Sequence, residues 1–128
     1  MMVSVAQAFS RLMLSPRIPA DRYDLAPSDR GLYCFWHRFR CLYVGRSKNL
    51  RERMAEHMRG DGDPGLAGYV RKYEGEITVS CSRLGCTAGF IRIAEIFAIL
   101  KLKPKFNDRH VRRDSRFSPA RLTCHHAC

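Results

Sequence analysis

The sequence has 128 residues, which is enough for one domain with short extensions and a single modest core. Hydrophobic residues make up 45% of it and charged residues 27%, as in ordinary globular proteins, and no apolar run approaches membrane-spanning length. The net charge of +11 is not ordinary, and it favours a polyanionic partner, nucleic acid before a membrane surface. A generally basic, soluble surface is the alternative explanation.

The first predicted element is a short amphipathic helix. Apolar residues recur at near-helical spacing between Val3 and Leu14, and Pro16 and Pro19 end the pattern. We interpret residues 1–30 as an N-terminal helical arm followed by a loop. The arm packs either on the domain or on a partner, which leaves a homodimer or a targeting partner open.

Two short apolar and aromatic runs predict a β-hairpin. Leu32–Trp36 and Cys41–Val44 flank a polar turn and are rich in residues that favour strands. Because side chains alternate along a strand, Tyr33 and Phe35 share one face. Tyr43 lies on the returning strand, at a separation that can bring its hydroxyl near that of Tyr33.

A helix is predicted directly after the hairpin. Gly45 ends the second strand, and Ser47 or Asn49 can cap the helix. Arg53 and His57 are four residues apart and therefore share one helical face. The hairpin and this helix together supply two phenols, a guanidinium and an imidazole, which are groups suited to phosphodiester chemistry.

The remaining elements are a short helix over Leu66–Tyr73, a strand over Glu76–Cys81 and a long helix over Ala88–Lys101. The long helix is apolar on nearly all sides, which predicts a central, buried position. Its only carboxylate is Glu95. This acid either pairs with Arg92 one turn back or has a functional role, since an unpaired buried carboxylate is costly.

The paired sequences Gly31-Leu32-Tyr33 and Tyr43-Val44-Gly45, with Arg53 and His57 downstream, resemble the signature of the GIY-YIG nuclease family. Leu32 and Val44 stand where that signature has isoleucine. The resemblance extends as far as Asn107. Within the family, the chain resembles the excision-repair and homing-type endonucleases. It implies a small α/β (α+β) domain over residues 31–108, with a three-stranded, mainly antiparallel sheet flanked by helices in the order β-β-α-α-β-α.

The resemblance also implies a metal-dependent endonuclease that hydrolyses DNA, double-stranded or branched, in DNA repair or mobile-element processing. One Mg²⁺ or Mn²⁺ would be held by Glu95, Arg53 would grip the phosphate, and Tyr33 or Tyr43 would activate water with His57. Which tyrosine is the base stays open. The implied catalytic set, which includes a supporting asparagine, is Tyr33, Tyr43, Arg53, His57, Glu95 and Asn107.

Further basic residues are candidates for DNA contacts. Residues 101–128 contain eight of the 23 Lys+Arg residues and two of the 12 Asp+Glu residues. We therefore expect residues 109–128 to form a basic, flexible tail that holds phosphates non-specifically. The candidate DNA-binding residues are Arg46, Lys48, Arg51, Lys103, Lys105, Arg109, Arg112 and Arg113.

The six cysteines predict no disulfide framework, because no secretory signal precedes them and a reducing, cytoplasmic and DNA-associated location is the default. The segment Cys124–Cys128 carries two cysteines and two histidines but no second ligand cluster, so a frayed chain end is favoured over a zinc site. Two rival functions remain: a catalytically silent DNA-binding or interaction module of the same fold, and a basic interaction protein that dimerises through its arm.

Overall fold

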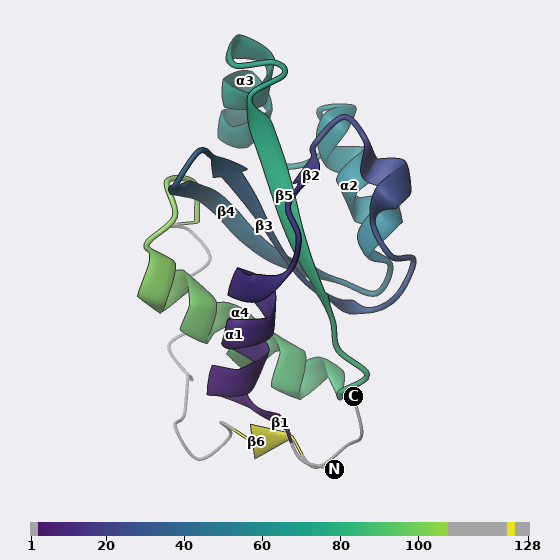
Figure 1. The fold of residues 1–128 in the computed structure, drawn as a ribbon, viewed down its shortest axis with the longest axis vertical. Coiled ribbons are helices and arrows are strands. Elements are labelled where there is room, and N and C mark those ends of the chain that lie inside the picture. Colours follow the sequence, from purple (N-terminus) through teal and green to yellow (C-terminus); the bar gives the residue numbers. More distant parts are fainter. Residues whose placement is uncertain (1–2, 108–122, 125–128) are drawn as a thin grey trace.

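The computed structural model describes residues 3–107 and 123–124. From residue 31 to residue 107, the strands and helices follow the order β-β-α-α-β-α that the sequence predicted (Figure 1). The described elements, in chain order, are β1 (Val3–Ser4), α1 (Val5–Leu14), β2 (Ile18–Pro19), the 3₁₀ helix η1 (Tyr23–Leu25), β3 (Gly31–His37), β4 (Arg40–Ser47), α2 (Leu50–Met58), α3 (Pro64–Lys72), β5 (Ile77–Arg83), α4 (Ala88–Leu102) and β6 (Thr123–Cys124).

The main sheet is antiparallel and has four strands in the order β2-β5-β3-β4. The prediction of three strands is corrected by β2, which adds Ile18 and Pro19 to the edge beside β5. This strand has two residues, too few to show an alternating pattern. Proline has no backbone N–H to donate, and an edge strand tolerates it because one side of that strand needs no partner.

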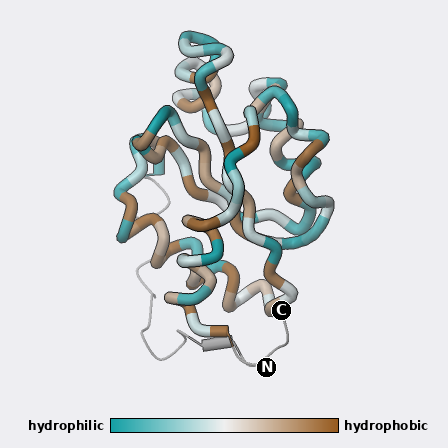
Figure 2. Tube along the Cα trace, viewed as in Figure 1, coloured by the Kyte–Doolittle hydropathy of each residue, from teal (hydrophilic) through white to brown (hydrophobic). Residues whose placement is uncertain are grey.

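Helices cover both faces of the sheet, as predicted. One core contains the alternate strand residues Leu32, Cys34 and Trp36, packed with α1 and α4. The other core contains Tyr33 and Phe35, packed with residues of α2 and α3. Figure 2 shows hydrophobic residues recurring along the strands and α4, while the connections are mainly hydrophilic. The strand alternation therefore assigns the tyrosines to the face that α2 covers.

The N-terminal helix packs on the domain, which is the first of the two alternatives considered for it. Ser4 and Gln7 form a capping box at its start, and Val5, Ala8 and Leu12 are buried. Phe9 contacts Phe97 of α4 edge to face, with 5.7 Å between ring centroids. The arm thus belongs to the layer that holds α4 against the sheet (Figure 1).

The long helix α4 is central, as predicted. Thr87 caps it by accepting a hydrogen bond from the backbone N–H of Phe90. It ends at Leu102, where Lys103 adopts a left-handed conformation with φ of 48° and Pro104 follows. Within the described residues, no helix is long and apolar enough to cross a membrane.

The structure changes two expectations, one about the C-terminal residues and one about the cysteines. Thr123 and Cys124 form β6, antiparallel to β1, so this piece of the predicted tail belongs to a small sheet. The other tail residues, with most of the Cys124–Cys128 segment, lie outside the described residues. Cys34 and Cys41 are buried free thiols, as expected. Cys86 forms a disulfide bond, which departs from the expectation of cysteines in a reducing environment, and spacing along a sequence does not reveal which cysteines meet.

Candidate active site

A cleft of about 410 Å³ opens at the end of the hairpin where β3 begins and β4 ends. The antiparallel register, which pairs Gly31 with Ser47, brings these two strand ends together. Helix α2 contributes Arg53 to the wall, and the first half of α4 contributes Ala88, Ile91 and Glu95. The full lining consists of Arg30, Tyr33, Tyr43, Gly45, Arg46, Ser47, Lys48, Arg53, Ala88, Ile91 and Glu95.

The charges of this lining are mostly positive. Four lining residues are cationic and one is acidic, namely Arg30, Arg46, Lys48, Arg53 and Glu95. A concave surface with this excess of guanidinium and ammonium groups attracts an anion, and arginine in particular suits phosphate oxygens. The cleft therefore fits a phosphate-bearing ligand better than a neutral one.

Glu95 faces this cleft from α4, where it is the only acidic residue. Its residue is 6% exposed, and its Oε1 accepts a hydrogen bond from Nη1 of Arg46 at 3.0 Å. The buried acid of α4 is therefore paired with a cation that β4 supplies. Arg46 was expected as a DNA contact, and its contact with Glu95 was not anticipated.

The two predicted catalytic tyrosines lie together on the same face of the hairpin. Their rings are stacked, with centroids 6.1 Å apart and an interplanar angle of 25°. Gly45 is directly opposite Tyr33 in the strand register, and a Cβ atom at position 45 would overlap the Tyr33 phenol ring. Glycine at this position is therefore what allows the Tyr33 ring to lie flat across β4.

Both phenols are harder to ionise than a free tyrosine. Burial, and next the neighbouring Tyr43, raise the pKa of Tyr33 above its ordinary value of 10.0. Burial, and next the carboxylate of Glu95, raise the pKa of Tyr43. Each phenol is therefore a neutral hydroxyl at neutral pH, able both to donate and to accept a hydrogen bond.

His57 lies behind Tyr33 and does not line the cleft. Its Nε2 is 2.7 Å from the Tyr33 hydroxyl, and the residue is 5% exposed. Burial, and next the nearby Arg53, lower the pKa of His57 from 6.5 to about 4. At neutral pH the ring is therefore an uncharged imidazole, and its hydrogen bond to the Tyr33 hydroxyl connects it to a residue that lines the cleft.

Arg53 reaches the cleft from the same helical face as His57, as the four-residue spacing predicted. Asn49 caps the helix by accepting a hydrogen bond from the backbone N–H of Glu52. One Arg53 nitrogen, Nη1, donates to Oε2 of Glu56 at 2.6 Å. This pair fixes one side of the guanidinium, and a planar guanidinium has further N–H donors with which to hold an anion.

Asn107 supports the site from a distance and does not line the cleft. Its Oδ1 accepts from the backbone N–H of Val44 at 2.6 Å, and its Nδ2 donates to the Val44 carbonyl at 2.8 Å. The side chain is buried, and both ends of its amide are used on β4. Asn107 therefore holds in place the strand that carries Tyr43 and Arg46.

The candidate DNA-binding residues fall into separate places. Arg46 and Lys48 line the cleft. The Arg51 guanidinium instead donates to the Ala26 carbonyl at 2.8 Å, which ties α2 to the loop before β3. Neither Lys103 nor Lys105 lines the cleft. The remaining three candidates, Arg109, Arg112 and Arg113, lie outside the described residues.

Arg30 lines the cleft and was missed by the sequence analysis. It precedes the first residue of β3, and its Nη1 donates to the Cys86 carbonyl at 3.3 Å. The hairpin register could have revealed it, because a residue just before Gly31 must lie beside the residue that follows Ser47.

A single-carboxylate metal site is compatible with this geometry. The described residues contain no group of three or more His, Cys, Asp or Glu side chains that could hold an ion. Mg²⁺ often binds proteins through one or two carboxylates, keeps several waters and takes further oxygens from a phosphate. Glu95, facing a cleft with room for water and phosphate, fits that requirement.

Solved structures with a similar fold are known. The chain matches the GIY-YIG N-terminal endonuclease domain of UvrC from Thermotoga maritima bound to magnesium, with a TM-score of 0.55, 22% identity, and 68% of this chain and 92% of that chain covered. A point mutant of the same domain with its catalytic divalent cation matches with a TM-score of 0.52 at 21% identity, covering 67% and 90% of the two chains. No family model matches the sequence, and no curated protein matches it significantly.

The chain has the GIY-YIG endonuclease fold. The fold match covers 68% of the chain, so the resemblance recognised in the sequence is confirmed at the level of architecture. Within this GIY-YIG fold, the two tyrosines, Arg53 and Glu95 meet in one cleft, while His57 and Asn107 stand behind it.

Proposed function

We propose that the protein is a metal-dependent endonuclease that hydrolyses phosphodiester bonds in DNA. The observation that carries this proposal is that Glu95, Tyr33, Tyr43 and Arg53, drawn from four separate elements, line one cleft with an excess of positive charge. The fold supports it further, because the UvrC domain that this chain resembles is described as an endonuclease with a catalytic divalent cation.

Glu95 would hold one Mg²⁺ or Mn²⁺ ion, and Arg46 would share the same carboxylate. When bound there, the ion supplies positive charge to the phosphoryl oxygens and to the departing alkoxide. The wall of α4 around Glu95 is apolar, with Ile91 one turn earlier. This limits competing water and strengthens the electrostatic contribution of the carboxylate.

The cationic residues would hold the DNA strand. Arg53 faces the cleft beside the tyrosines and is placed to hold the scissile phosphate. Arg30 and Lys48, from the two paired strand ends, would hold neighbouring phosphates along the backbone. Charge-assisted contacts of this kind fix the reacting phosphate in place before chemistry begins.

Tyr33 is the better placed of the two phenols to pass on a proton. Its hydroxyl lines the cleft and is hydrogen-bonded to His57 at 2.7 Å. Because the raised pKa of Tyr33 disfavours a free phenolate and the lowered pKa of His57 makes the imidazole a weak base, the proton would move only as the water attacks: the phenol would take the proton of the water while passing its own proton to the imidazole. Tyr43, stacked on Tyr33, would orient that water.

The alternative function is a DNA-binding or interaction module of the same fold without nuclease activity. Such a module needs the cationic residues of the cleft but has no use for a buried carboxylate turned toward the bound phosphate. A carboxylate there repels phosphate unless a cation lies between them. The position of Glu95 therefore favours the nuclease.

The test is the conversion of supercoiled plasmid to nicked and linear forms with Mg²⁺ or Mn²⁺, in parallel with linear, nicked, flapped and branched DNAs. Glu95→Gln preserves the size of the side chain and should lower the cutting rate by at least about a hundredfold. Glu52→Gln, an exposed acid in the first turn of α2, is the matched control and should cut like the parent. Equal cutting by the parent and Glu95→Gln would refute the assignment of the site.

A further inference from the structure

The turn between β3 and β4 exposes an aromatic ring between two arginines. Phe39 is 94% exposed, more than any other large hydrophobic residue in the part of the chain that the structure describes. Arg38 and Arg40, on either side of it, are also exposed. Single exposed hydrophobic residues are common on protein surfaces, so exposure by itself does not indicate a binding site.

The backbone of this turn is also unusual. Arg38 has φ of 57°, in the left-handed region. His37 pairs with Arg40, so the loop has two residues, and such loops favour glycine or asparagine where φ is positive. A larger side chain in this conformation costs about 1 kcal/mol. Turn formation therefore explains neither the arginine in a strained position nor the phenylalanine in water.

The base of the turn is held on two sides. Arg17 donates from Nη1 to the Arg38 carbonyl at 2.6 Å, and its guanidinium lies 4.0 Å from the centroid of the Trp36 ring. On the other side, the two ring nitrogens of His37 lie 2.7 Å from the Tyr69 hydroxyl and 3.2 Å from a Glu76 carboxylate oxygen. A firmly held turn presents Phe39 at a low entropy cost for any ligand that binds it.

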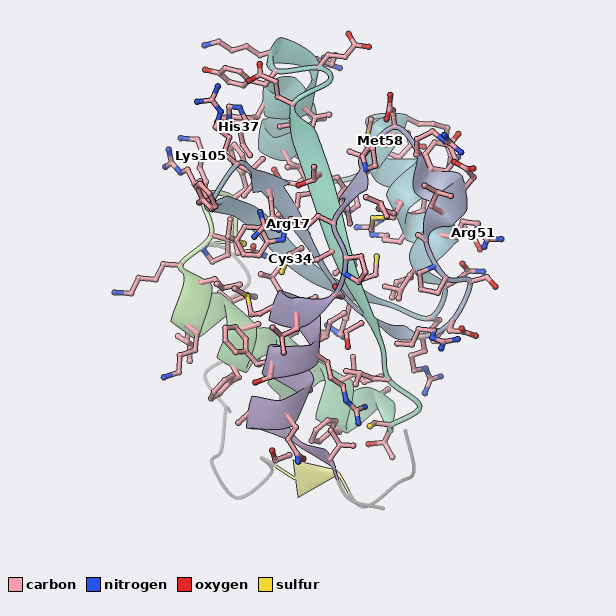
Figure 3. The ribbon with its side chains drawn as sticks, viewed as in Figure 1. Arg17, Cys34, His37, Arg51, Met58 and Lys105 are labelled. Carbon is pink, nitrogen blue, oxygen red and sulfur yellow. The ribbon has the colours of Figure 1, made fainter. Side chains whose placement is uncertain are left out.

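Positive charge surrounds the exposed ring. The side chain of Arg38 is 80% exposed, with only a 3.7 Å approach to Glu76. Lys105 lies beside the hairpin, because its backbone N–H donates to the Cys41 carbonyl at 3.3 Å, and in the view of Figure 3 its side chain is drawn on the same side of the molecule as that of His37. These cations are complementary to backbone phosphates on either side of a base stacked on Phe39.

We propose that this turn is a second DNA contact, in which Phe39 stacks on an unpaired base while Arg38, Arg40 and Lys105 hold the flanking phosphates. Aromatic stacking accepts any base but requires one that is not paired in a duplex. The partner is therefore DNA with a single-stranded region, such as a bubble, flap or fork. The choice of DNA rests on the proposed function of the cleft.

The contact lies away from the cleft. The turn is at one end of the β3–β4 hairpin, and the cleft is at the other end, where Gly31 pairs with Ser47. Strand β3 has seven residues. At about 3.3 Å per residue it spans roughly 20 Å, or about six base pairs of B-form DNA. A branched substrate could therefore reach both places, and the turn would favour cleavage near a junction.

The experiment compares binding of a fully paired duplex with binding of a bubble duplex of the same length, in EDTA so that no cleavage occurs. Phe39→Ala should weaken binding to the bubble about tenfold and to the paired duplex by less than about twofold. Phe39→Trp should restore bubble binding. The matched control is Leu14→Ala on α1, which removes a side chain that is 84% exposed and should change neither affinity.

The proposal is overturned if Phe39→Ala binds the bubble like Leu14→Ala, or if the parent does not prefer the bubble. Plasmid cutting separates this proposal from the nuclease proposal. If Phe39→Ala loses the preference for the bubble but the parent shows no Glu95-dependent cutting, the DNA contact at the turn is supported and the nuclease proposal is refuted. If the parent shows Glu95-dependent cutting but Phe39→Ala binds the bubble like the parent, the nuclease proposal is supported and the DNA contact at the turn is refuted.

Discussion

Arg46 and Glu95 form an ion pair across the cleft, with 3.0 Å between Nη1 and Oε1. The carboxylate side chain is 8% exposed and the guanidinium 42% exposed, so the acid is buried while its partner reaches solvent. A divalent ion at Glu95 would share the carboxylate with this guanidinium. A DNA phosphate entering the cleft would compete with Glu95 for Arg46 and so make room for the ion.

This relationship predicts that Arg46→Gln binds metal more tightly than the parent when DNA is absent. Removing a positive charge beside the carboxylate should raise the affinity for Mn²⁺ about fivefold, since a partly exposed ion pair contributes about 1 kcal/mol. The measurement is a Mn²⁺ titration followed by electron paramagnetic resonance. Arg22→Gln, in an exposed ion pair with Asp24, is the control. Unchanged Mn²⁺ affinity in Arg46→Gln would contradict competition for Glu95.

Tyr33→Phe should fold but cut slowly. The substitution removes the hydroxyl that links the cleft to His57, and loss of a proton-transferring group typically lowers rates by about 10² to 10⁴-fold. The buried imidazole also loses a partner, which should cost about 1 kcal/mol or more of unfolding free energy. Single-turnover cleavage and urea denaturation measure the two effects.

Tyr43→Phe is the comparison for this prediction. Both variants keep the stacked rings, whereas the hydroxyl hydrogen-bonded to His57 is that of Tyr33. Tyr43→Phe should therefore reduce the cleavage rate less than Tyr33→Phe. The reverse order would assign the proton transfer to Tyr43.

Asn107→Ala should lower stability more than it lowers metal affinity. The variant leaves the N–H and the carbonyl of Val44 without the partners that Asn107 provides, and two buried backbone groups without partners cost about 2 to 4 kcal/mol. Urea denaturation measures this loss, and a Mn²⁺ titration of the folded variant should give nearly the affinity of the parent. Loss of Mn²⁺ binding in a folded Asn107→Ala protein would mean that the asparagine meets the ion.

His57 should make stability fall with acid in a defined range. Its pKa is about 4 in the folded protein and 6.5 as the ordinary value, so the unfolded chain takes up a proton first as the pH falls. Above pH 6.5 this difference in pKa does not affect the unfolding free energy. Between pH 6.5 and 4 the unfolding free energy falls by about 3 kcal/mol in total, and below pH 4 it falls no further on account of His57.

The check is the pH dependence of the unfolding free energy for the parent and for His57→Gln. The variant should show a shallower decline between pH 6.5 and 4 than the parent, because the carboxylates titrate in both proteins but the imidazole in only one. Parallel curves would mean that His57 is not buried as a neutral ring.

Much of the site could be predicted because local patterns carry it. The aromatic runs around a polar turn identified the hairpin, and the observed strands extend the predicted ones by one residue or a few at each end. The four-residue spacing of Arg53 and His57 placed both on one helical face. A single carboxylate in an apolar helix identified Glu95, because such a group requires a partner when it is buried.

The rest depends on contacts between residues far apart in the sequence. The Arg46–Glu95 pair joins positions separated by 49 residues, and Asn107 meets Val44 across 63. The disulfide of Cys86 likewise requires a tertiary approach that spacing does not show. Strand β2 escaped prediction for a different reason, since its two residues pair only because β5 offers an open edge.

The most direct test of the proposed site is the number of Mn²⁺ ions bound by the parent and by Glu95→Gln, each with a short duplex in which non-hydrolysable phosphonate linkages replace the cleavable phosphodiesters. We expect one tightly bound ion in the parent and its loss in Glu95→Gln, with circular dichroism unchanged, if this carboxylate is the protein ligand of the ion as proposed. Equal Mn²⁺ binding by both proteins would contradict it.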